Sequence, residues 1–174
     1  MSRDWFQWWQ SLSDPQPNPE DDRRAAAMLG LMVGDALGAS WEFTDADEIW
    51  VEEFEMRGGG PFGFALGETT DDTAMTIGAL GGYDDVGAFD AKIALQNYLL
   101  WLESGPKDVG NQTRVALAHW KNDPTGPPLD LDEEAQGNGT AMRAAAHGIG
   151  SVTAAAAVDH AVADAYLTHP SHVA

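Results

Sequence analysis

The order of apolar and polar residues along the chain predicts a succession of helices. Residues 87–104 carry the clearest pattern, because their apolar side chains recur at helical spacing and would form one stripe on a helix. The same periodicity predicts further helices at 22–39, 70–80, 109–120, 141–146 and 152–167. Runs with the alternating pattern of strands are almost absent, so we expect an all-α fold, a bundle of about six helices.

Residues 1–22 differ in composition from the rest of the chain, and we expect them to form an N-terminal appendage to one helical domain over 23–174. An aromatic cluster is followed by a proline at every second position, which is typical of extended chain. The cluster either packs back on the domain as a short helix or serves as a docking handle for a partner. The residues are Trp5, Phe6, Trp8, Trp9, Pro15, Pro17 and Pro19.

The charge balance narrows the classes of partner. The chain has 174 residues with 28 Asp and Glu against 9 Lys and Arg, a net charge of -19. Proteins that follow a nucleic-acid backbone bring cations to its phosphates, so we exclude that class, and anionic membranes are disfavoured for the same reason. Cysteine is absent, which excludes a thiolate metal site or nucleophile. The most apolar stretch, 25–39, is too short to cross a bilayer, so we expect a cytoplasmic protein without membrane partners.

The strongest local motif is Thr70-Asp71-Asp72-Thr73, at the predicted start of a helix. Thr at the N-cap and carboxylates in the first turn satisfy free N–H groups and favour the helix dipole, so capping alone accounts for part of this motif. Two adjacent acids exceed what capping needs. Their oxygens also suit a hard cation such as Mg²⁺ or Mn²⁺, and both interpretations stay open.

A second motif, Gly34-Asp35-Ala36-Leu37-Gly38, is followed by Glu42. Asp35 falls inside an apolar helical segment, where a buried acid needs a partner. Glu42 lies between two aromatic residues and is either exposed beside packed rings or a pocket carboxylate with a raised pKa, suited to acid/base work. Gly30, Gly34 and Gly38 share one helix face, which predicts close approach by a neighbouring helix or a ligand.

Two further motifs lie in the C-terminal third of the chain. Gly137-Asn138-Gly139-Thr140, followed by Met142-Arg143, is either an ordinary loop or a loop that offers N–H groups to a phosphate ahead of a helix. Thr168-His169-Pro170 places a histidine where a regular helix cannot continue. We expect His169 to form a hydrogen bond with a ligand or with the core.

Together these motifs, in this order and at these intervals, resemble the ADP-ribosylglycohydrolase family, which includes the dinitrogenase-reductase-activating glycohydrolases. The resemblance covers about residues 23–172. It implies an orthogonal all-α bundle and hydrolysis of the glycosidic bond that joins ADP-ribose to a protein side chain or small acceptor. It also implies two Mg²⁺ or Mn²⁺ ions in the cleft.

The resemblance implies a role for each matching residue. Thr70, Asp71 and Asp72 would ligate metal together with Glu42, and Glu42 would act on water beside the scissile bond. The catalytic set is therefore Glu42, Asp71 and Asp72. The substrate-binding set is Gly137, Asn138 and Gly139, which would line the diphosphate-ribose region, with His169 contacting ADP-ribose.

Family members usually continue to a Gly-Gly-Asp-Thr-Asp-Thr-like segment that supplies the other metal ligands, and the 174 residues contain no such segment. We therefore expect the isolated chain to hydrolyse its substrate very slowly or not at all. The alternatives are a non-catalytic ADP-ribose-binding or interaction module, and one half of a split enzyme. In the second case a complementing C-terminal chain or a further copy would supply the missing ligands.

Overall fold

The computed structural model describes residues 18–49, 55–129 and 137–170, and every regular element in these ranges is helical, which confirms the all-α prediction. No helix in the described ranges is both long and apolar enough to span a membrane. The aromatic cluster of residues 5–9 lies outside the described residues. The α-helices are α2 (Pro19–Gly38), α3 (Asp71–Leu80), α4 (Ala91–Glu103), α5 (Asn111–Asn122), α6 (Ala145–Gly150) and α7 (Ala154–Ala165), with short 3₁₀ turns η1 (Ala39–Trp41), η2 (Ala46–Glu48) and η4 (Ala141–Arg143).

Two helices begin at other residues than the periodicity predicts, because capping side chains decide the starts. Helix α2 begins at Pro19, before the expected Asp22, since the Asn18 side chain accepts a hydrogen bond from the Glu20 backbone N–H at 3.1 Å. Helix α4 begins at Ala91 instead of residue 87. There Asp90 caps the helix by accepting from the Lys92 N–H at 2.8 Å, and the residues before it form a turn.

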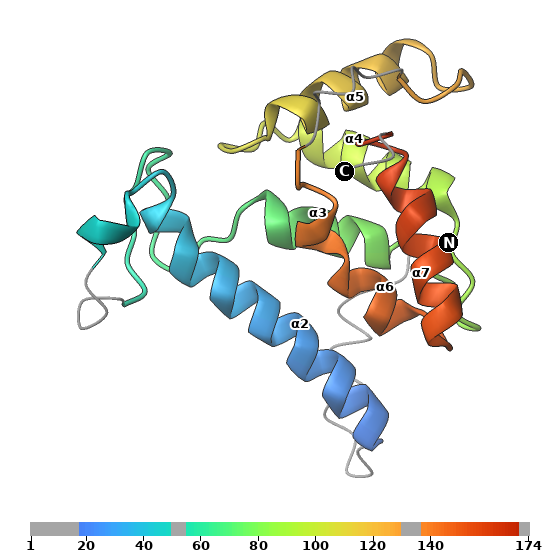
Figure 1. Cartoon of the computed structure of the whole chain (residues 1–174), viewed down its shortest axis with the longest axis horizontal. Helices are drawn as coiled ribbons and strands as arrows, with labels where there is room; N and C mark the ends of the chain where they lie inside the picture. The colour runs from blue at the N-terminus through green and yellow to red at the C-terminus, as the bar shows by residue number, and fades with distance from the viewer. Residues whose placement is uncertain (1–17, 50–54, 130–136, 171–174) are drawn as a thin grey trace.

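Helix α3 lies in the middle of the bundle and packs against α2, α4 and α6 (Figure 1). Gly78 lets α3 lie close to α4, because a side chain at this position would bring its Cβ to 2.8 Å from the Tyr98 ring. The apolar core gathers around this contact. Its buried members are Met28, Met75, Ala79, Leu80, Ala94, Leu95, Tyr98, Leu117, Trp120, Ala146 and Leu167.

The sequence predicts that the glycine face of α2 is approached by a neighbouring helix or by a ligand. Within the described residues no neighbouring helix approaches it, so the first of these alternatives is wrong. A Cβ added at Gly30, Gly34 or Gly38 would meet nothing within 4 Å. Gly34 and Gly38 instead border a cavity that also holds Glu42 in its wall. The small residues thus leave space beside the carboxylate rather than admitting another helix.

Asp35 joins α2 to the start of α3. Its carboxylate accepts hydrogen bonds from the Thr70 backbone N–H at 2.9 Å, from the Thr70 hydroxyl at 2.8 Å and from the Thr73 N–H at 3.1 Å. The predicted need of this half-buried acid for a partner is therefore confirmed. Because the free N–H groups of α3 are satisfied by a carboxylate on another helix, the position of α3 depends on α2.

A buried ion pair joins η4 to α7. Arg143 Nε donates to Asp164 Oδ2 at 2.5 Å, and the two side chains are 0% and 2% exposed. Asp164 Oδ1 accepts a further bond from the Tyr98 hydroxyl at 2.7 Å, which brings α4 into the same network. Burial raises the pKa of Asp164, but the nearby His147 ring, the positive charge of Arg143 and the hydrogen bond from Tyr98 outweigh it and hold the pKa below its ordinary value, so Asp164 stays ionised.

We predict that Asp35→Ala lowers the free energy of unfolding by about 2 kcal/mol, because it removes the acceptor of three bonds at the start of α3. Urea unfolding followed by circular dichroism measures the loss. Asp47→Ala, at an exposed position of η2, is the matched control and should change stability by no more than about 0.5 kcal/mol. Equal effects of the two substitutions would contradict the role of Asp35.

We predict a larger loss, about 3–5 kcal/mol, for Asp164→Asn, because it leaves the Arg143 guanidinium buried without a counter-charge. Asp159→Asn, at an exposed position of the same helix, removes the same charge and should have little effect. Denaturant midpoints of both variants test this. A loss for Asp164→Asn no greater than that for Asp159→Asn would show that the ion pair does not stabilise the fold.

Candidate active site

Five carboxyl groups gather near the N-terminus of α3, namely Asp35, which accepts the hydrogen bonds described above, and four that make up the acidic cluster. Glu42 follows η1, Asp71 and Asp72 form the first turn of α3, and Asp108 comes from the loop between α4 and α5. The first three are predicted from the sequence. Asp108 is missed, because a single acid in a loop after Gly105 and Pro106 has no pattern that separates it from other loop acids such as Asp123.

The capping hydrogen bonds of α3 come from Thr70 and Asp35. Thr70 is the N-cap and accepts from the Asp72 N–H at 3.4 Å, and Asp35 takes the N–H groups of Thr70 and Thr73. The Asp71 carboxylate is instead stabilised by the backbone N–H of Gly110, outside the helix. Thr70 and Asp35 thus satisfy the N–H groups at the start of α3, and Asp71 and Asp72 lie in its first turn, where carboxylates also favour the helix dipole.

The four carboxyl groups interact strongly. Burial raises the pKa of Glu42 to about 7, and the negative charges of Asp108, Asp71 and Asp72 add to the effect. Burial, followed by the charges of Asp108 and Asp72, raises the pKa of Asp71 to about 6. The sequence left two alternatives for Glu42, an exposed side chain or a pocket carboxylate with a raised pKa. The structure agrees with the second, because Glu42 lines a cavity and its pKa is raised. A carboxyl group with a pKa near 7 exchanges protons readily at neutral pH.

Two cavities divide the cluster. Glu42 and Asp72 line a cavity of about 350 Å³ whose wall also includes Asp35, Gly38 and Met142. A smaller cavity, about 140 Å³, is lined by Thr70, Asp71 and Asp108 among others. Asp71 and Asp72, neighbours in sequence, therefore face different spaces.

The cluster suits a divalent cation in its chemistry. Its donors are oxygens only, and the buried Glu42 Oε2 has no hydrogen-bond partner among the described residues. A cation would also relieve the mutual repulsion of the carboxylates. The side chains do not form a complete set of ligands, however. In the described ranges no three His, Asp or Glu side chains lie close enough together to hold one ion. The described residues thus supply the charge and the donor type but not a closed ligand shell.

The glycine loop and His169 lie together, as the second set of predicted residues requires. A Cβ at Gly139 would be 2.9 Å from His169 Cε1, and one at Gly137 would be 3.1 Å from His169 Nε2. The glycines therefore let the loop lie directly against the ring. Asn138 is exposed. The loop is followed by the turn η4 and then by α6, where the sequence predicts one helix over 141–146. The Gly137 N–H donates to Gln112 Oε1 at 3.0 Å.

The segment that leads into α5 connects the two sets of residues. Asp108 belongs to the carboxyl cluster, the Gly110 N–H stabilises Asp71, and Gln112 accepts from Gly137. The Gln112 Nε2 is buried without a hydrogen-bond partner among the described residues.

The sequence and the fold both match known proteins. The chain is 37% identical over 136 residues to the ADP-ribosylarginine hydrolase Tri1 of Pseudomonas putida (strain GB-1). The aligned region covers 74% of this chain and 36% of that protein. The chain is also 37% identical over 126 residues to the ADP-ribosyl-[dinitrogen reductase] glycohydrolase of Rhodospirillum rubrum, covering 70% of this chain and 42% of that protein. The chain thus spans less than half the length of these two relatives.

Among solved structures, a chain of an ADP-ribosylglycohydrolase-related protein complex superposes with a TM-score of 0.69 at 34% sequence identity. The match covers 87% of this chain and 50% of that one. The family model described as ADP-ribosylglycohydrolase matches residues 15–174. With its helical fold, its acidic cluster at the start of α3 and its glycine loop beside His169, the chain belongs to the ADP-ribosylglycohydrolase family.

Proposed function

We propose that this protein removes ADP-ribose from a modified protein side chain by hydrolysis of the glycosidic bond. The observation that carries the proposal is Glu42, a carboxyl group with a pKa of about 7 that lines a cavity within a cluster of acids. The relatives named above are called an ADP-ribosylarginine hydrolase and an ADP-ribosyl-[dinitrogen reductase] glycohydrolase. Both names support a modified protein as the substrate class.

The chemistry of the bond fits the charges of the site. Its cleavage builds positive charge on the ribose C1 and ring oxygen, which nearby carboxylates stabilise. Ionised Glu42 accepts a proton from the attacking water. It then returns that proton to the leaving group or to solvent, which regenerates the carboxylate. The pKa of about 7 is that of the cluster without a cation, and a bound cation would lower it.

Thr70, Asp71, Asp72 and Glu42 are the residues that we propose to hold Mg²⁺ or Mn²⁺. The ion, when bound, supplies charge neutralisation and positions water and ribose hydroxyls. Further oxygen ligands, from outside the described ranges or from a second chain, would complete the shell for the two ions expected in this family.

Gly137, Asn138, Gly139 and His169 are proposed to hold the diphosphate-ribose part of the substrate. His169 is buried beside the loop, and the absence of side chains at Gly137 and Gly139 lets its ring lie directly against the loop backbone. A protein of net charge -19 repels an anionic ligand at long range, so the proposed cation is also needed for substrate binding.

We predict that Glu42→Gln slows release of ADP-ribose from an ADP-ribosylated arginine peptide by about 100-fold or more, because the variant cannot exchange the proton. The rate is measured in single turnover with Mg²⁺ and the protein in excess, which detects even the slow hydrolysis that we expect of this chain alone. Glu48→Gln, at an exposed position of η2, is the control and should keep the wild-type rate.

Two results would contradict this assignment. Equal rates for the Glu42 variant and the wild type would remove Glu42 from the chemistry. Binding of ADP-ribose without release above the uncatalysed rate, with serine-linked peptides included, would favour the second candidate, a non-catalytic ADP-ribose-binding module. The incomplete ligand shell is the observation that favours this candidate.

We predict that Asp71→Ala combined with Asp72→Ala abolishes binding of Mn²⁺ in isothermal titration calorimetry, because it removes two of the proposed oxygen donors. Asp45→Ala combined with Asp47→Ala removes the same charge from exposed positions and should leave the affinity unchanged. Equal affinities of the wild type and the Asp71 and Asp72 variant would show that the cluster does not bind the ion.

A further inference from the structure

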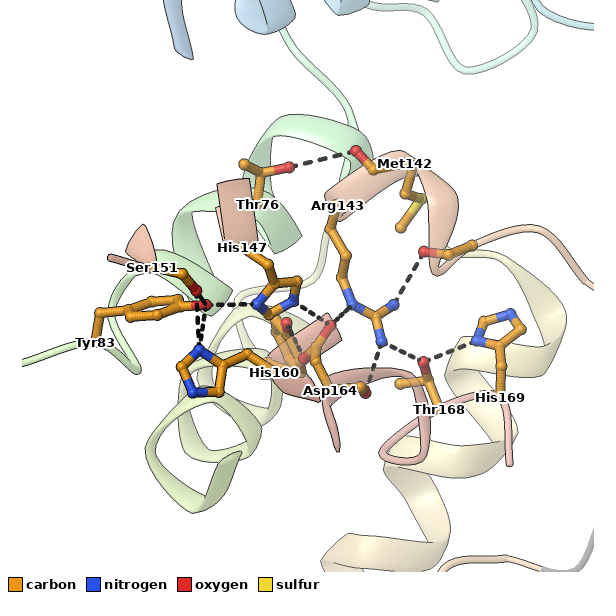
Figure 2. Close-up of polar contacts among 12 residues, drawn as sticks. Thr76, Tyr83, Met142, Arg143, His147, Ser151, His160, Asp164, Thr168 and His169 are labelled. Carbon is orange, nitrogen blue, oxygen red and sulfur yellow. Dashed lines mark hydrogen bonds and ion pairs between the residues drawn. The ribbon is translucent and has the colours of Figure 1, made fainter. Parts of the chain in front are cut away.

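Each of the three guanidinium nitrogens of Arg143 donates at least one hydrogen bond. Besides the Asp164 carboxylate, Nη1 donates to the Gly139 carbonyl at 3.0 Å, and Nη2 donates to the Asp164 carbonyl at 3.1 Å and to Thr168 Oγ1 at 2.7 Å (Figure 2). A guanidinium group only donates hydrogen bonds and stays protonated in proteins. The Thr168 hydroxyl oxygen is therefore an acceptor in its bond with Arg143.

This bond decides where the hydroxyl proton of Thr168 points. The residue is 0% exposed, and the other contact of its hydroxyl within the described residues is His169 Nδ1 at 2.8 Å. If Thr168 accepted from both neighbours, its own proton would be buried without a partner, which costs free energy. The hydroxyl therefore donates to His169 Nδ1.

The direction of that bond determines the tautomer of His169. A ring nitrogen that accepts a hydrogen bond carries no proton, so the proton of the neutral ring lies on Nε2. The ring is also held neutral. Burial, and then the positive charge of Arg143, lower the pKa of His169 to about 4, and Asp164 only partly opposes them.

The Nε2 atom faces the glycine loop. A Cβ at either Gly137 or Gly139 would be 3.1 Å from it. Within the described residues no hydrogen bond is made to this atom, and the His169 side chain as a whole is buried. The same Arg143 that orients Thr168 also holds the Gly139 carbonyl, and so it fixes both the ring and the loop.

We propose that Arg143 and Thr168 are positioning residues that hold His169 as the neutral Nε2–H tautomer, so that it donates a hydrogen bond to an anionic or hydroxyl oxygen of the ligand at the glycine loop. The ligand part of this inference rests on the proposed function, with ADP-ribose as the ligand. A neutral donor with one fixed tautomer selects for a ligand oxygen, since it offers no acceptor to a ligand N–H or O–H donor.

The test has a readout that does not depend on ligand or activity. Nitrogen-15 NMR of the histidine-labelled chain at pH 7 distinguishes protonated from unprotonated ring nitrogens. We expect His169 in the wild type to show protonated Nε2 and unprotonated Nδ1. Thr168→Val keeps the shape of the side chain but removes the hydroxyl, so Nδ1 should lose its hydrogen-bonded shift and the ring should populate both tautomers. Thr168→Ser should restore the wild-type spectrum.

Calorimetry with ADP-ribose and Mg²⁺ supplies the second readout. We expect Thr168→Val to weaken binding about tenfold and Thr168→Ser to stay within about twofold of the wild type. Thr125→Val, at an exposed turn position, is the control and should change neither spectrum nor affinity. If the Thr168→Val variant does not fold, the test rests on two measurements: the tautomer of His169 in the wild type, and the spectrum and affinity of Thr168→Ser compared with those of the wild type.

The outcomes separate the two proposals. A wild-type His169 protonated on Nδ1, or a tautomer that Thr168→Val leaves unchanged, would overturn the positioning role whatever the ligand result. A wild-type chain with the expected tautomer that does not bind ADP-ribose would instead contradict the proposed function and leave the positioning of His169 standing.

Discussion

The buried ion pair of Arg143 and Asp164 is the interaction on which the C-terminal half of the structure depends. Removing two charges from water costs several kcal/mol for each, and the cost is offset only when each donor and acceptor has a partner. The pair meets this condition by recruiting Tyr98, Thr168 and the Gly139 carbonyl. Each of these comes from a different part of the chain. The ion pair therefore fixes α4, the glycine loop and the end of α7 relative to one another.

The carboxyl cluster at α3 is organised in the opposite way, because like charges lie close together and no cation of comparable burial in the described ranges is paired with them. Asp71 has the Gly110 N–H and Asp72 has the Thr70 hydroxyl as partners, but the pKa values of Glu42, Asp71 and Asp72 are all raised. Raised pKa values in a group of this kind are typical of functional sites, where repulsion in the free protein is relieved by a ligand. The fold thus combines a buried, charge-paired network with a cluster of mutually repelling acids.

One segment of the chain lies between the carboxyl cluster and the glycine loop. The segment from Asp108 to Gln112 belongs to the acids at one end and accepts a hydrogen bond from the glycine loop at the other. The loop between α4 and α5 therefore links two sets of residues that are far apart in the sequence.

Local patterns in the sequence were sufficient for the helices and for the Thr70 cap, because helical periodicity and capping depend on residues a few positions apart. Glu42, Asp71, Asp72, the glycine loop and His169 became candidates through the resemblance of several motifs, in order, to a known family, because each motif alone also fits an ordinary structural role. The starts of α2 and α4 were shifted from the expected residues, because the caps at Asn18 and Asp90 and not the apolar period set them.

Only the tertiary structure decided how these residues are used. Asp35 and Thr70 are 35 positions apart, so nothing local shows that Asp35 caps α3. Asp108 joins the cluster, and Arg143 reaches Asp164 and Thr168, only through packing of distant segments. The pKa of Glu42 and the tautomer of His169 depend on burial and on charges brought from elsewhere in the chain. The sequence by itself therefore determined the helices and the candidate residues, and the long-range contacts determined their protonation and their roles.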